Sequence, residues 1–313
     1  MRQKELGKTG KRIPELGIGT WKMGEHPEEE IAAIRKAIHL KMNLVDTAEM
    51  YGNERLIGKA IEGQKGVFIA TKVSPHHFRH DDVIRACRES VAKLGVKAID
   101  LYQLHWPNGM IPIRETMSAM EELVDMGLIK HIGISNFSVE ETKAAQEAMK
   151  KYEIVSNQVE YNLLVRDIES ELMDYCAEEK ITIIAYSPIA QGAIVNGSQP
   201  ELSAALAAIG KKYKKTPAQV ALNWVVSHGN VVAIPKTSSP ERAAENAGAS
   251  GWSMTAEEKG MLEGAAIPKK SRASTTKPLI SGLGFISGAY QSFSSFKNRN
   301  AHRSSKTTKS SKK

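Results

Sequence analysis

The sequence contains only two cysteines, Cys87 and Cys176. Two thiols are too few for a disulfide framework, and they lack the paired spacing typical of a zinc site. No apolar run reaches the roughly 18 residues that a membrane-spanning helix needs, and Met1 to Gly10 has no apolar stretch like that of a secretory signal. We therefore expect a cytoplasmic protein with no transmembrane segment and no metal site.

Aromatic residues are also scarce, at 6%, but apolar residues make up 41% and charged residues 25% of the 313 residues. This balance is that of an ordinary soluble globular protein with enough apolar material for a large core, and it excludes a wholly disordered chain. The length alone suits either two small domains or one large domain, because α/β barrels of about 250 residues fold as one unit.

Acidic residues are absent from the end of the chain. Lys269 to Lys313 holds 11 of the 43 Lys and Arg residues and no Asp or Glu, which leaves 32 basic and 35 acidic side chains before it. The net charge of +8 therefore arises from this tail, and an anionic partner should first be sought there. Because its Ser-rich composition cannot form much core, we expect 269–313 to be a basic, largely disordered extension. Such a tail would bind polyanions non-specifically, and we expect no specific nucleic-acid partner.

An apolar island, LISGLGFISGAYQSFSSF, interrupts this basic tail and holds Phe285, Phe293 and Phe296. It can dock on the rest of the protein, touch a membrane surface, bind a partner or belong to an unstructured extension. The sequence does not decide among these four roles.

Eight short runs rich in β-branched residues recur along the chain. They begin at Leu16, Asn43, Val67, Ile99, Ile129, Ile154, Ile181 and Val231. The stretches between them place apolar residues at helical spacing, for example at 28–40, 81–94, 113–126, 139–152, 168–180 and 217–228. Near-continuous apolar strands joined by helical crossovers predict a parallel sheet buried on both faces. Eight such units predict an α/β fold, a (β/α)8 TIM barrel that forms a single domain over 1–268.

Polar residues follow these runs, and the chemistry of such a barrel takes place where its strands end. Asp46 and Tyr51 follow the second run, Lys72 ends the third, and His105 ends the fourth. Later runs lead to Ser135, Asn136, Gln158, Glu160, Tyr186, Ser187, Lys236 and Thr237. A solvated charge or a structural hydrogen bond explains each one alone. The fold, however, would direct the first four toward one cavity, which is typical of a catalytic site.

Several segments occur in a familiar order, namely NLVDTAEMYGNE, VFIATK, LYQLHWP, IGISNF, NQVEYNLL, IAYSPIAQG and IPKTSSPERAAEN. In order and spacing, over about Glu5 to Ala266, they resemble the aldo-keto reductase family. The resemblance implies a metal-independent barrel enzyme that transfers hydride between NADPH and a small carbonyl substrate, with NADH as a weaker cofactor. It assigns a catalytic tetrad, with Tyr51 as the proton donor, to Asp46, Tyr51, Lys72 and His105.

The chemistry of carbonyl reduction agrees with these roles. Hydride delivered to a carbonyl carbon leaves negative charge on the oxygen, so the site needs a proton donor and a polarising group. We expect the Lys72 ammonium to lower the pKa of the Tyr51 phenol, and Asp46 to keep Lys72 charged and in place. His105 would direct a ring N–H toward the substrate oxygen. The structural alternative is a buried Asp46–Lys72 ion pair that only orders the barrel mouth.

The segment after the eighth run suits a phosphate group. Ser239 is a natural N-cap for a helix whose first residue is Pro240, and the unpaired N–H groups of a helix start favour an anion. Arg242 lies in the first turn, where a guanidinium can bind a ribose 2′-phosphate through two hydrogen bonds. An ordinary capped helix with solvated charges is the alternative.

The resemblance assigns further cofactor residues. Those at the adenosine-phosphate end are Lys236, Thr237, Arg242, Glu245 and Asn246. Tyr186 would stack on the nicotinamide ring, and the carboxamide would be bound by Ser135, Asn136 and Gln158. The remaining cofactor contacts are Thr20, Trp21, Asp46, Ser187 and Ile189. Core or rim packing is the alternative for Tyr186, and a hydrogen-bonding role in the core is the alternative for the three polar residues. No Rossmann fingerprint is present, because Lys22 stands where its third glycine should be.

The stretch from His105 to Arg114 is short, so most of the loop that walls the substrate pocket in longer relatives is missing. We therefore expect an open pocket, lined by Trp21, Tyr51, His105 and Trp106, although either Trp can simply pack at the rim. The physiological substrate and the oligomeric state are not determined by the sequence.

Two other functions remain open at this stage. Some proteins that resemble this family bind the nicotinamide cofactor and act as channel subunits or redox-sensing regulatory modules with little turnover. The intact tetrad argues against this role, and the unusual tail argues for it. A Schiff-base aldolase that uses Lys72 is the other. We favour an NADPH-dependent reductase of aldehydes or ketones.

Overall fold

The structure is a computed structural model that describes residues 1–267. The predicted basic extension over 269–313, its apolar island and its binding of polyanions therefore lie outside the described residues. The same holds for the predicted domain boundary after residue 268.

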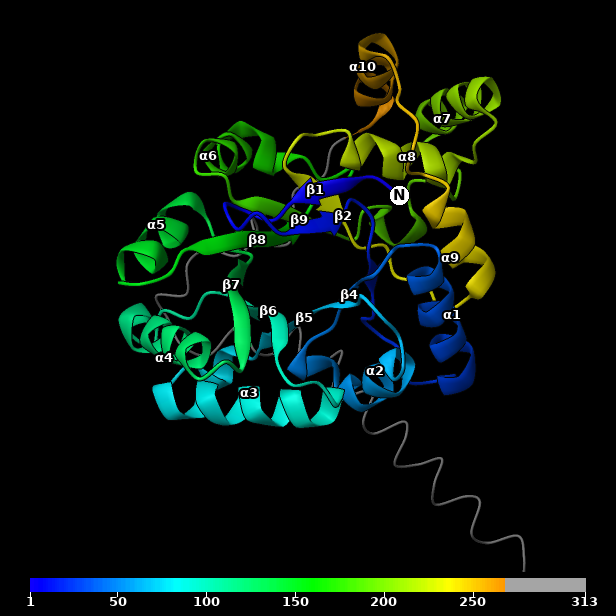
Figure 1. The fold of residues 1–313 in the computed structure, drawn as a ribbon. Coiled ribbons are helices and arrows are strands. Elements are labelled where there is room, and N and C mark those ends of the chain that lie inside the picture. Colours follow the sequence, from blue (N-terminus) through cyan, green and yellow to red (C-terminus); the bar gives the residue numbers. More distant parts are fainter. Residues whose placement is uncertain (268–313) are drawn as a thin grey trace, which may run out of the picture. The chain divides into compact units, whose positions relative to one another are not determined.

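Eight parallel strands form one sheet that closes into a (β/α)8 barrel (Figure 1). In order around the barrel they are β3 (Ile18–Gly19), β4 (Leu44–Asp46), β5 (Phe68–Val73), β6 (Ile99–Leu104), β7 (Ile129–Ser135), β8 (Ile154–Glu160), β9 (Thr182–Tyr186) and β10 (Val231–Ala233). The first and last strands are joined by hydrogen bonds from Gly17 N to Ala233 O at 2.8 Å and from Gly19 N to Pro235 O at 3.2 Å. The predicted fold class is confirmed.

Helices connect the strands on the outside of the barrel. They are α1 (Pro27–His39), α2 (Glu54–Ile61), α3 (His80–Leu94), α4 (Ile113–Asp125), α5 (Val139–Glu147), α6 (Leu172–Glu178), α7 (Pro200–Tyr213), α8 (Pro217–Val226), α9 (Pro240–Ala247) and α10 (Ala256–Ala265). Short 3-10 helices occur at η1 (Glu49–Tyr51), η2 (Pro75–His77), η3 (Asp167–Ser170) and η4 (Ala190–Gly192). Each of the six predicted amphipathic stretches contains a helix, although α5 and α6 are shorter than their stretches.

An N-terminal hairpin of β1 (Gln3–Glu5) and β2 (Arg12–Pro14) was not predicted. It crosses the barrel end that faces the viewer in Figure 1 and contacts the starts of β9 and β10. The Lys4 ammonium donates to the main-chain oxygens of Val226, His228 and Val231 at 2.5 to 2.7 Å. The hairpin thus closes the end of the barrel opposite to the carboxyl ends of the strands.

Alternation along the strands produces two apolar clusters. The cluster inside the barrel includes Leu44, Phe68, Leu101, Ile184 and Val232, and the cluster between strands and helices includes Val45, Ile69, Tyr102, Ile183 and Val231. Successive side chains of a strand point to opposite faces, so one strand supplies both clusters. Toward the carboxyl ends the inward positions become polar, as at Asp46 and Lys72. The barrel thus has an apolar interior and a polar mouth.

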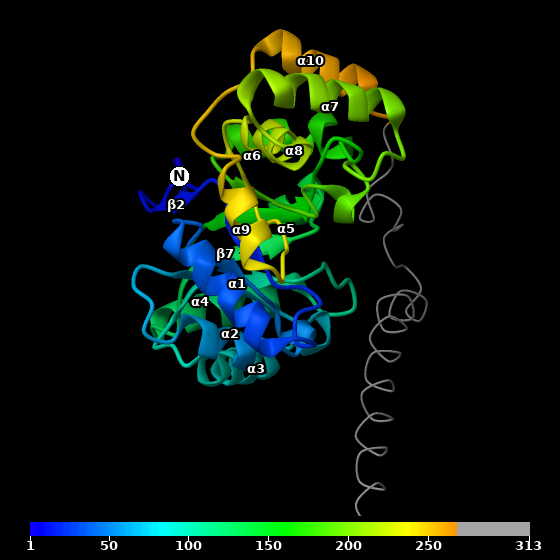
Figure 2. The same ribbon diagram turned by 90° about the vertical axis from the view of Figure 1, so that its right-hand side faces the viewer.

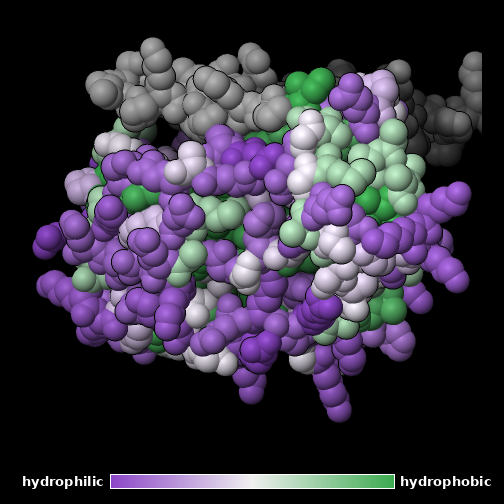
Figure 3. Space-filling view, turned by 90° about the horizontal axis from the view of Figure 1, so that it is seen from above, coloured by the Kyte–Doolittle hydropathy of each residue, from purple (hydrophilic) through white to green (hydrophobic). Residues whose placement is uncertain are grey.

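The helices pack as neighbours around this barrel. α1 lies beside α9, and α10 lies along α7 (Figures 1 and 2). The face shown in Figure 3 is mostly hydrophilic, with hydrophobic residues in small patches. Within the described residues, no helix combines the length and apolar character needed to cross a membrane.

Candidate active site

Four side chains singled out from the sequence converge at the carboxyl ends of β4, β5 and β6. Lys72 Nζ lies 2.7 Å from Asp46 Oδ1 and 3.4 Å from Tyr51 Oη. The rings of Tyr51 and His105 meet edge to face, with centroids 5.6 Å apart. Asp46 ends β4, Tyr51 ends η1 on the following loop, Lys72 lies in β5, and His105 directly follows β6. The structure therefore brings the whole predicted tetrad together.

Strand alternation places Lys72 inside the barrel, because it follows Phe68 and Ala70 on the inner face of β5. The residue is completely buried, and its Nζ also donates to the main-chain oxygen of Thr47 at 2.9 Å. An ammonium has three hydrogens, and Asp46, Thr47 and Tyr51 provide three acceptors. This saturation holds Lys72 as an ammonium and argues against its use as a Schiff-base nucleophile.

Burial shifts the pKa of the Tyr51 phenol. It raises the pKa of Tyr51 well above the ordinary value, and the nearby Asp46 carboxylate adds to the rise. The prediction that Lys72 lowers this pKa is therefore wrong for this structure. The reason is that the Lys72 charge is paired with Asp46 at 2.7 Å, whereas its distance to the phenol oxygen is 3.4 Å. Tyr51 is consequently protonated at neutral pH, which is the state that a proton donor requires.

Burial shifts the pKa values of His105 and Lys72 in the opposite direction, downward. It lowers the pKa of His105 well below the ordinary value, and the Lys72 charge lowers it further. Burial also lowers the pKa of Lys72, whereas the Asp46 carboxylate opposes that shift. His105 is thus a neutral imidazole at neutral pH, and its Nδ1 is buried without a partner among residues 1–267. A neutral ring can donate one N–H hydrogen bond without adding a charge to the site.

The second oxygen of Asp46 is bound by an amide from across the barrel. Gln158 Nε2 lies 2.8 Å from Asp46 Oδ2 and 3.4 Å from Gln103 Oε1. Gln103 was not singled out from the sequence, although its position two residues before His105 on an inward-facing strand could have identified it. The site therefore contains a buried row of Gln103, Gln158, Asp46 and Lys72.

A β-bulge directs Gln158 into the barrel. Val155 belongs to the inner apolar cluster, and strict alternation would place a residue three positions later on the outer face. The register between β7 and β8 shifts between Ile132 and Gly133, so that Val155 has no partner on β7 while Ser156 pairs with Gly133. An extra residue of this kind reverses the direction of the side chains that follow. Gln158 consequently reaches Asp46.

Asn136 joins the predicted carboxamide-binding residues to the predicted stacking ring. Its Nδ2 donates to Ser135 Oγ at 3.0 Å and to the main-chain oxygen of His105 at 3.2 Å. Its Oδ1 accepts from Tyr186 Oη at 3.0 Å, and Ser135 Oγ donates to the main-chain oxygen of Gln158 at 2.8 Å. Asn136 has a φ of 65°, a left-handed conformation that Asn adopts more readily than most residues. Ser135, Asn136, Gln158 and Tyr186 thus form one connected group at the mouth.

The other residues expected near the mouth are placed at strand ends. Thr20 is buried and its Oγ1 donates to the main-chain oxygen of Asp46 at 2.9 Å, while Trp21 and Trp106 are half-buried. After β9, the main-chain oxygen of Ser187 accepts from Asn162 Nδ2 at 3.0 Å. Ile189 is half-buried and packs against the outer core. Glu160, which ends β8, is half-buried.

The predicted phosphate segment begins α9. Ser239 caps this helix, with its Oγ accepting from Arg242 N at 3.3 Å, and Lys236 Nζ donates to Ser238 Oγ at 2.7 Å. Arg242 and Lys236 are exposed, whereas Thr237 and Asn246 are buried. The Glu245 carboxylate accepts from Thr216 Oγ1 at 2.6 Å, so it faces the start of α8. Two exposed cations thus stand at a capped helix start.

A buried carboxylate that the sequence analysis missed supports the neighbouring loop. Glu30, in the first turn of α1, accepts from Gly24 N at 2.7 Å through its Oε2 and is almost completely buried. This bond ties the loop after β3, which carries Trp21, to α1. A hydrogen bond from a carboxylate to a main-chain N–H has no spacing signature, so only the fold reveals it.

One groove on the surface lies apart from the site. A surface groove of about 560 Å³ runs between α3 and α4, lined by residues such as His80, Arg85 and Met126, and it shares no residue with the tetrad. Within residues 1–267, no three His, Cys, Asp or Glu side chains are grouped so that they could hold a metal ion.

Comparison with known proteins decides the family. The model of the Aldo/keto reductase family matches residues 15–267. The chain belongs to the aldo-keto reductase family. This aldo-keto reductase is 36% identical over 272 residues to methylglyoxal reductase YeaE of Escherichia coli (strain K12), a match that covers 84% of this chain and 95% of the relative.

Solved structures agree with this family assignment. A thermostable aldo-keto reductase in complex with the inhibitor epalrestat is 38% identical, with a TM-score of 0.80 and coverage of 85% of this chain and 100% of that one. An aldo/keto reductase from Klebsiella pneumoniae in complex with NADP and acetate is 34% identical, with a TM-score of 0.78 and coverage of 87% and 99%. This aldo-keto reductase is thus an oxidoreductase with the fold of its family.

Proposed function

We propose that this aldo-keto reductase reduces small aldehydes or ketones with NADPH, and that Tyr51 donates the proton. One observation carries the proposal: the Lys72 ammonium bridges Asp46 and Tyr51 at the barrel mouth, beside the neutral His105 ring. The Escherichia coli relative is named a methylglyoxal reductase, which supports methylglyoxal as the first substrate to test. The NADP in the Klebsiella pneumoniae structure supports the choice of cofactor.

The residues present fit a phosphorylated nicotinamide cofactor, which supplies the hydride when it is bound. The exposed Lys236 and Arg242 at the start of α9 offer positive charge for a 2′-phosphate. At the other end, Tyr186 offers a ring held in place by Asn136, and Gln158 lies beside the tetrad. Cationic and aromatic groups therefore stand at separate parts of the mouth, as an elongated cofactor of this kind requires.

The tetrad divides the proton chemistry among its members. Tyr51, whose pKa burial raises further above neutrality, donates its proton to the carbonyl oxygen as that oxygen gains negative charge. The phenolate that remains is stabilised by the Lys72 ammonium 3.4 Å away. Asp46 holds this ammonium in place, and His105 donates a ring N–H toward the same substrate oxygen. Tyr51 and His105 thus act in their neutral forms, and Lys72 acts as an ammonium held by Asp46.

The short loop after β6 favours an open substrate site. Asn108 Nδ2 donates to the main-chain oxygen of Pro75 at 2.9 Å, which ties this loop to η2 instead of leaving it free to fold over the mouth. Trp21 and Trp106, both half-buried at strand ends, would supply the apolar wall. We therefore propose that the substrate site is open and lined by Trp21, Tyr51, His105 and Trp106.

The Tyr51→Phe variant tests the proposed donor. It removes one hydroxyl from a ring that can still pack, so carbonyl reduction should fall by about 10² to 10⁴-fold while NADP⁺ binding is retained. Turnover is followed as NADPH consumption with methylglyoxal, and binding as quenching of Trp fluorescence. Tyr102→Phe is the matched control, because Tyr102 Oη is buried without a partner among the described residues and its ring packs outside the barrel.

Near-full turnover in Tyr51→Phe would contradict the proposed mechanism. A wild-type protein that binds NADP⁺ and reduces none of a panel of small aldehydes and ketones would instead favour the regulatory or channel-subunit-like module. The Tyr102→Phe variant should match the wild type in both measurements.

A further inference from the structure

Gln103 is a buried polar residue for which the tetrad chemistry gives no role. It pairs with Lys72 in the register of β5 and β6, lies inside the barrel two residues before His105, and is completely buried. Leu101, two residues earlier on the same inner face, belongs to the apolar interior. An apolar residue at position 103 would continue that interior, so the presence of an amide requires an explanation.

The amide of Gln103 makes contact at its oxygen only. Oε1 lies 3.4 Å from Gln158 Nε2, whereas Nε2 is buried without a partner among residues 1–267. An unpartnered buried N–H group is costly, so the contribution that distinguishes Gln103 from an apolar residue is its acceptor. That acceptor faces Gln158.

The same contact saturates the nitrogen of Gln158. An amide NH₂ has two hydrogens, and here two acceptors surround it, Asp46 Oδ2 at 2.8 Å and Gln103 Oε1 at 3.4 Å. A rotated Gln158 amide would bring its own oxygen against these two oxygens, which is repulsive. The pair therefore holds Gln158 with its Oε1 turned away from both, and no hydrogen bond within residues 1–267 uses that oxygen.

Gly133 on β7, which pairs with Gln103 in the sheet, leaves room for the Gln103 side chain. A Cβ at residue 133 would lie 2.9 Å from Gln103 Cγ and 2.6 Å from Ser156 Oγ, both closer than side chains tolerate. The Gln103 side chain therefore occupies space that the absence of a side chain on Gly133 leaves open. This close approach is a place where glycine is required.

We propose that Gln103 is a positioning residue that orients the Gln158 amide, so that Gln158 Oε1 accepts a hydrogen bond from the NH₂ of the nicotinamide carboxamide. The proposal rests on the proposed function, because it takes the cofactor to be a nicotinamide nucleotide. Gln103 itself touches neither the cofactor nor the substrate. Through Gln158 Oε1, the site would accept a hydrogen bond from the N–H of the carboxamide, and it would not bind the carboxamide oxygen there.

The test compares two nucleotides that differ at one group. NADP⁺ and its acetylpyridine analogue, in which a methyl group replaces the carboxamide NH₂, are titrated against the full chain with Trp fluorescence as the readout. The wild type should bind NADP⁺ more tightly than the analogue by about threefold to tenfold, the value of one hydrogen bond. Gln103→Met, which keeps the length and removes the acceptor, should lower the ratio of the two dissociation constants below that of the wild type, with Asp46 Oδ2 still holding one hydrogen of the Gln158 amide.

Three further variants complete the experiment. Leu101→Met changes packing on the same inner face and touches no hydrogen bond, so its ratio should equal that of the wild type. Gln158→Met removes the proposed acceptor and shows the full loss of discrimination. Gln103→Asn, whose oxygen is too short to reach Gln158, repeats the test with a polar side chain if Gln103→Met does not fold.

The outcomes separate this proposal from the proposed function. A Gln103 variant that binds NADP⁺ with the wild-type ratio would overturn the positioning role, and so would a wild type that does not discriminate between the nucleotides. A wild type that binds neither nucleotide would overturn the proposed cofactor and this proposal with it. A lowered ratio in Gln103→Met and an unchanged ratio in Leu101→Met would support it.

Discussion

At the scale of single residues, the site depends on how two carboxylate oxygens are shared. Asp46 gives Oδ1 to Lys72 and Oδ2 to Gln158, and it is almost completely buried. A buried carboxylate of this kind is stable only while its partners remain. The ion pair therefore has a structural role in addition to its proposed catalytic one. A single substitution in it changes stability and turnover together.

The Lys72→Met variant should lose both activity and stability. Removing the ammonium leaves Asp46 buried without its charge partner, which costs about 3 to 5 kcal/mol, and leaves the Tyr51 phenolate without support. Adding Asp46→Asn removes the unpaired charge, so the double variant should regain most of the stability but no turnover. Thermal unfolding and NADPH consumption measure the two effects. Recovery of turnover in the double variant would mean that the ion pair only orders the mouth.

The Arg242→Ala variant should separate the two nicotinamide cofactors. We propose that its guanidinium binds the 2′-phosphate, which only NADPH carries, so affinity for NADPH should fall by about 1.5 to 3 kcal/mol while that for NADH changes little. Fluorescence titration with each cofactor is the measurement. Arg88→Ala, an exposed residue on α3, is the control. Equal losses for both cofactors would contradict this role of Arg242.

At the scale of elements, α10 shows how one carboxylate can anchor a helix. Glu258 accepts from Thr255 N at 2.8 Å in a capping box, from Lys212 Nζ at 2.6 Å and from Tyr213 Oη at 2.8 Å. The last two residues belong to α7, along which α10 lies. These hydrogen bonds lower the pKa of Glu258 to about 2, although burial opposes the shift.

The Glu258→Gln variant should therefore be less stable than the wild type near neutral pH, with a difference that shrinks in acid. A lowered pKa means that the stabilisation is complete above the unfolded-state pKa of about 4.3 and is lost as the pH falls toward about 2. Glu258→Ala should cost more, because it also removes the capping box, worth about 1 kcal/mol. Thermal unfolding across this pH range is the measurement.

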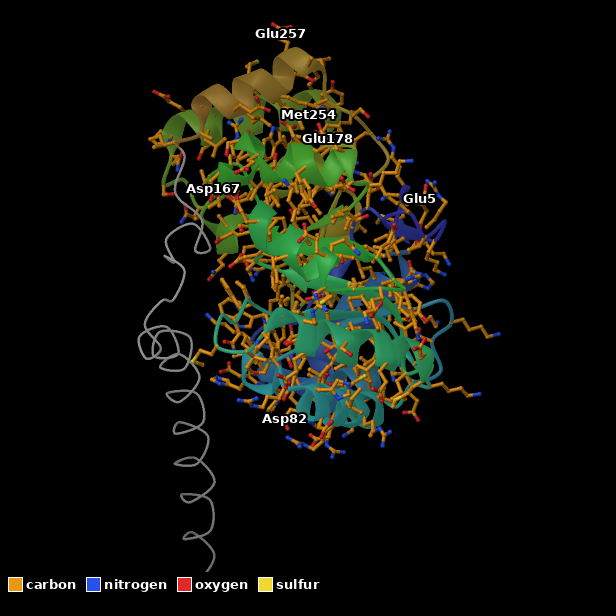
Figure 4. All side chains as sticks on the ribbon, turned by 90° about the vertical axis from the view of Figure 1, so that its left-hand side faces the viewer. Glu5, Asp82, Asp167, Glu178, Met254 and Glu257 are labelled. Carbon is orange, nitrogen blue, oxygen red and sulfur yellow. The ribbon has the colours of Figure 1, made fainter. Side chains whose placement is uncertain are left out.

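Glu257 supplies the control for this prediction. It lies one residue earlier on α10, is exposed, and points away from the rest of the described residues in Figure 4. Glu257→Gln should change the unfolding temperature little at any pH. A pH-independent difference between Glu258→Gln and the wild type would contradict the role assigned to the charge.

At the scale of the whole molecule, the division into a barrel and a basic extension after residue 268 stays a prediction. A chain that ends at Pro268 should lose the salt-sensitive binding of polyanions, because 11 positive charges are removed, and should keep its carbonyl reductase activity. Binding of two unrelated single-stranded DNA sequences at low and high salt is compared with NADPH consumption. A large loss of turnover after truncation would mean that the extension helps to build the active site.

Much of this architecture could be predicted because its signals are local. The alternation of β-branched runs with amphipathic stretches predicted eight strand and helix units, and the family resemblance picked out from the residues at the strand ends the four that we propose as the tetrad. The hairpin of β1 and β2 was missed because three-residue strands carry almost no periodicity. Its place across the barrel depends on Lys4 meeting carbonyls more than 220 residues away.

The sequence by itself therefore determined the barrel, the family resemblance and the choice of the four residues that we propose as the tetrad, since these follow from residue type and spacing. Only the tertiary structure decided the direction in which the pKa of Tyr51 shifts, because burial raises this pKa and Lys72 is already paired with Asp46. Only the bulge in β8 decided that Gln158 meets Asp46, 112 positions away. Burial and distance between remote residues arise when the chain closes, and no local pattern encodes them.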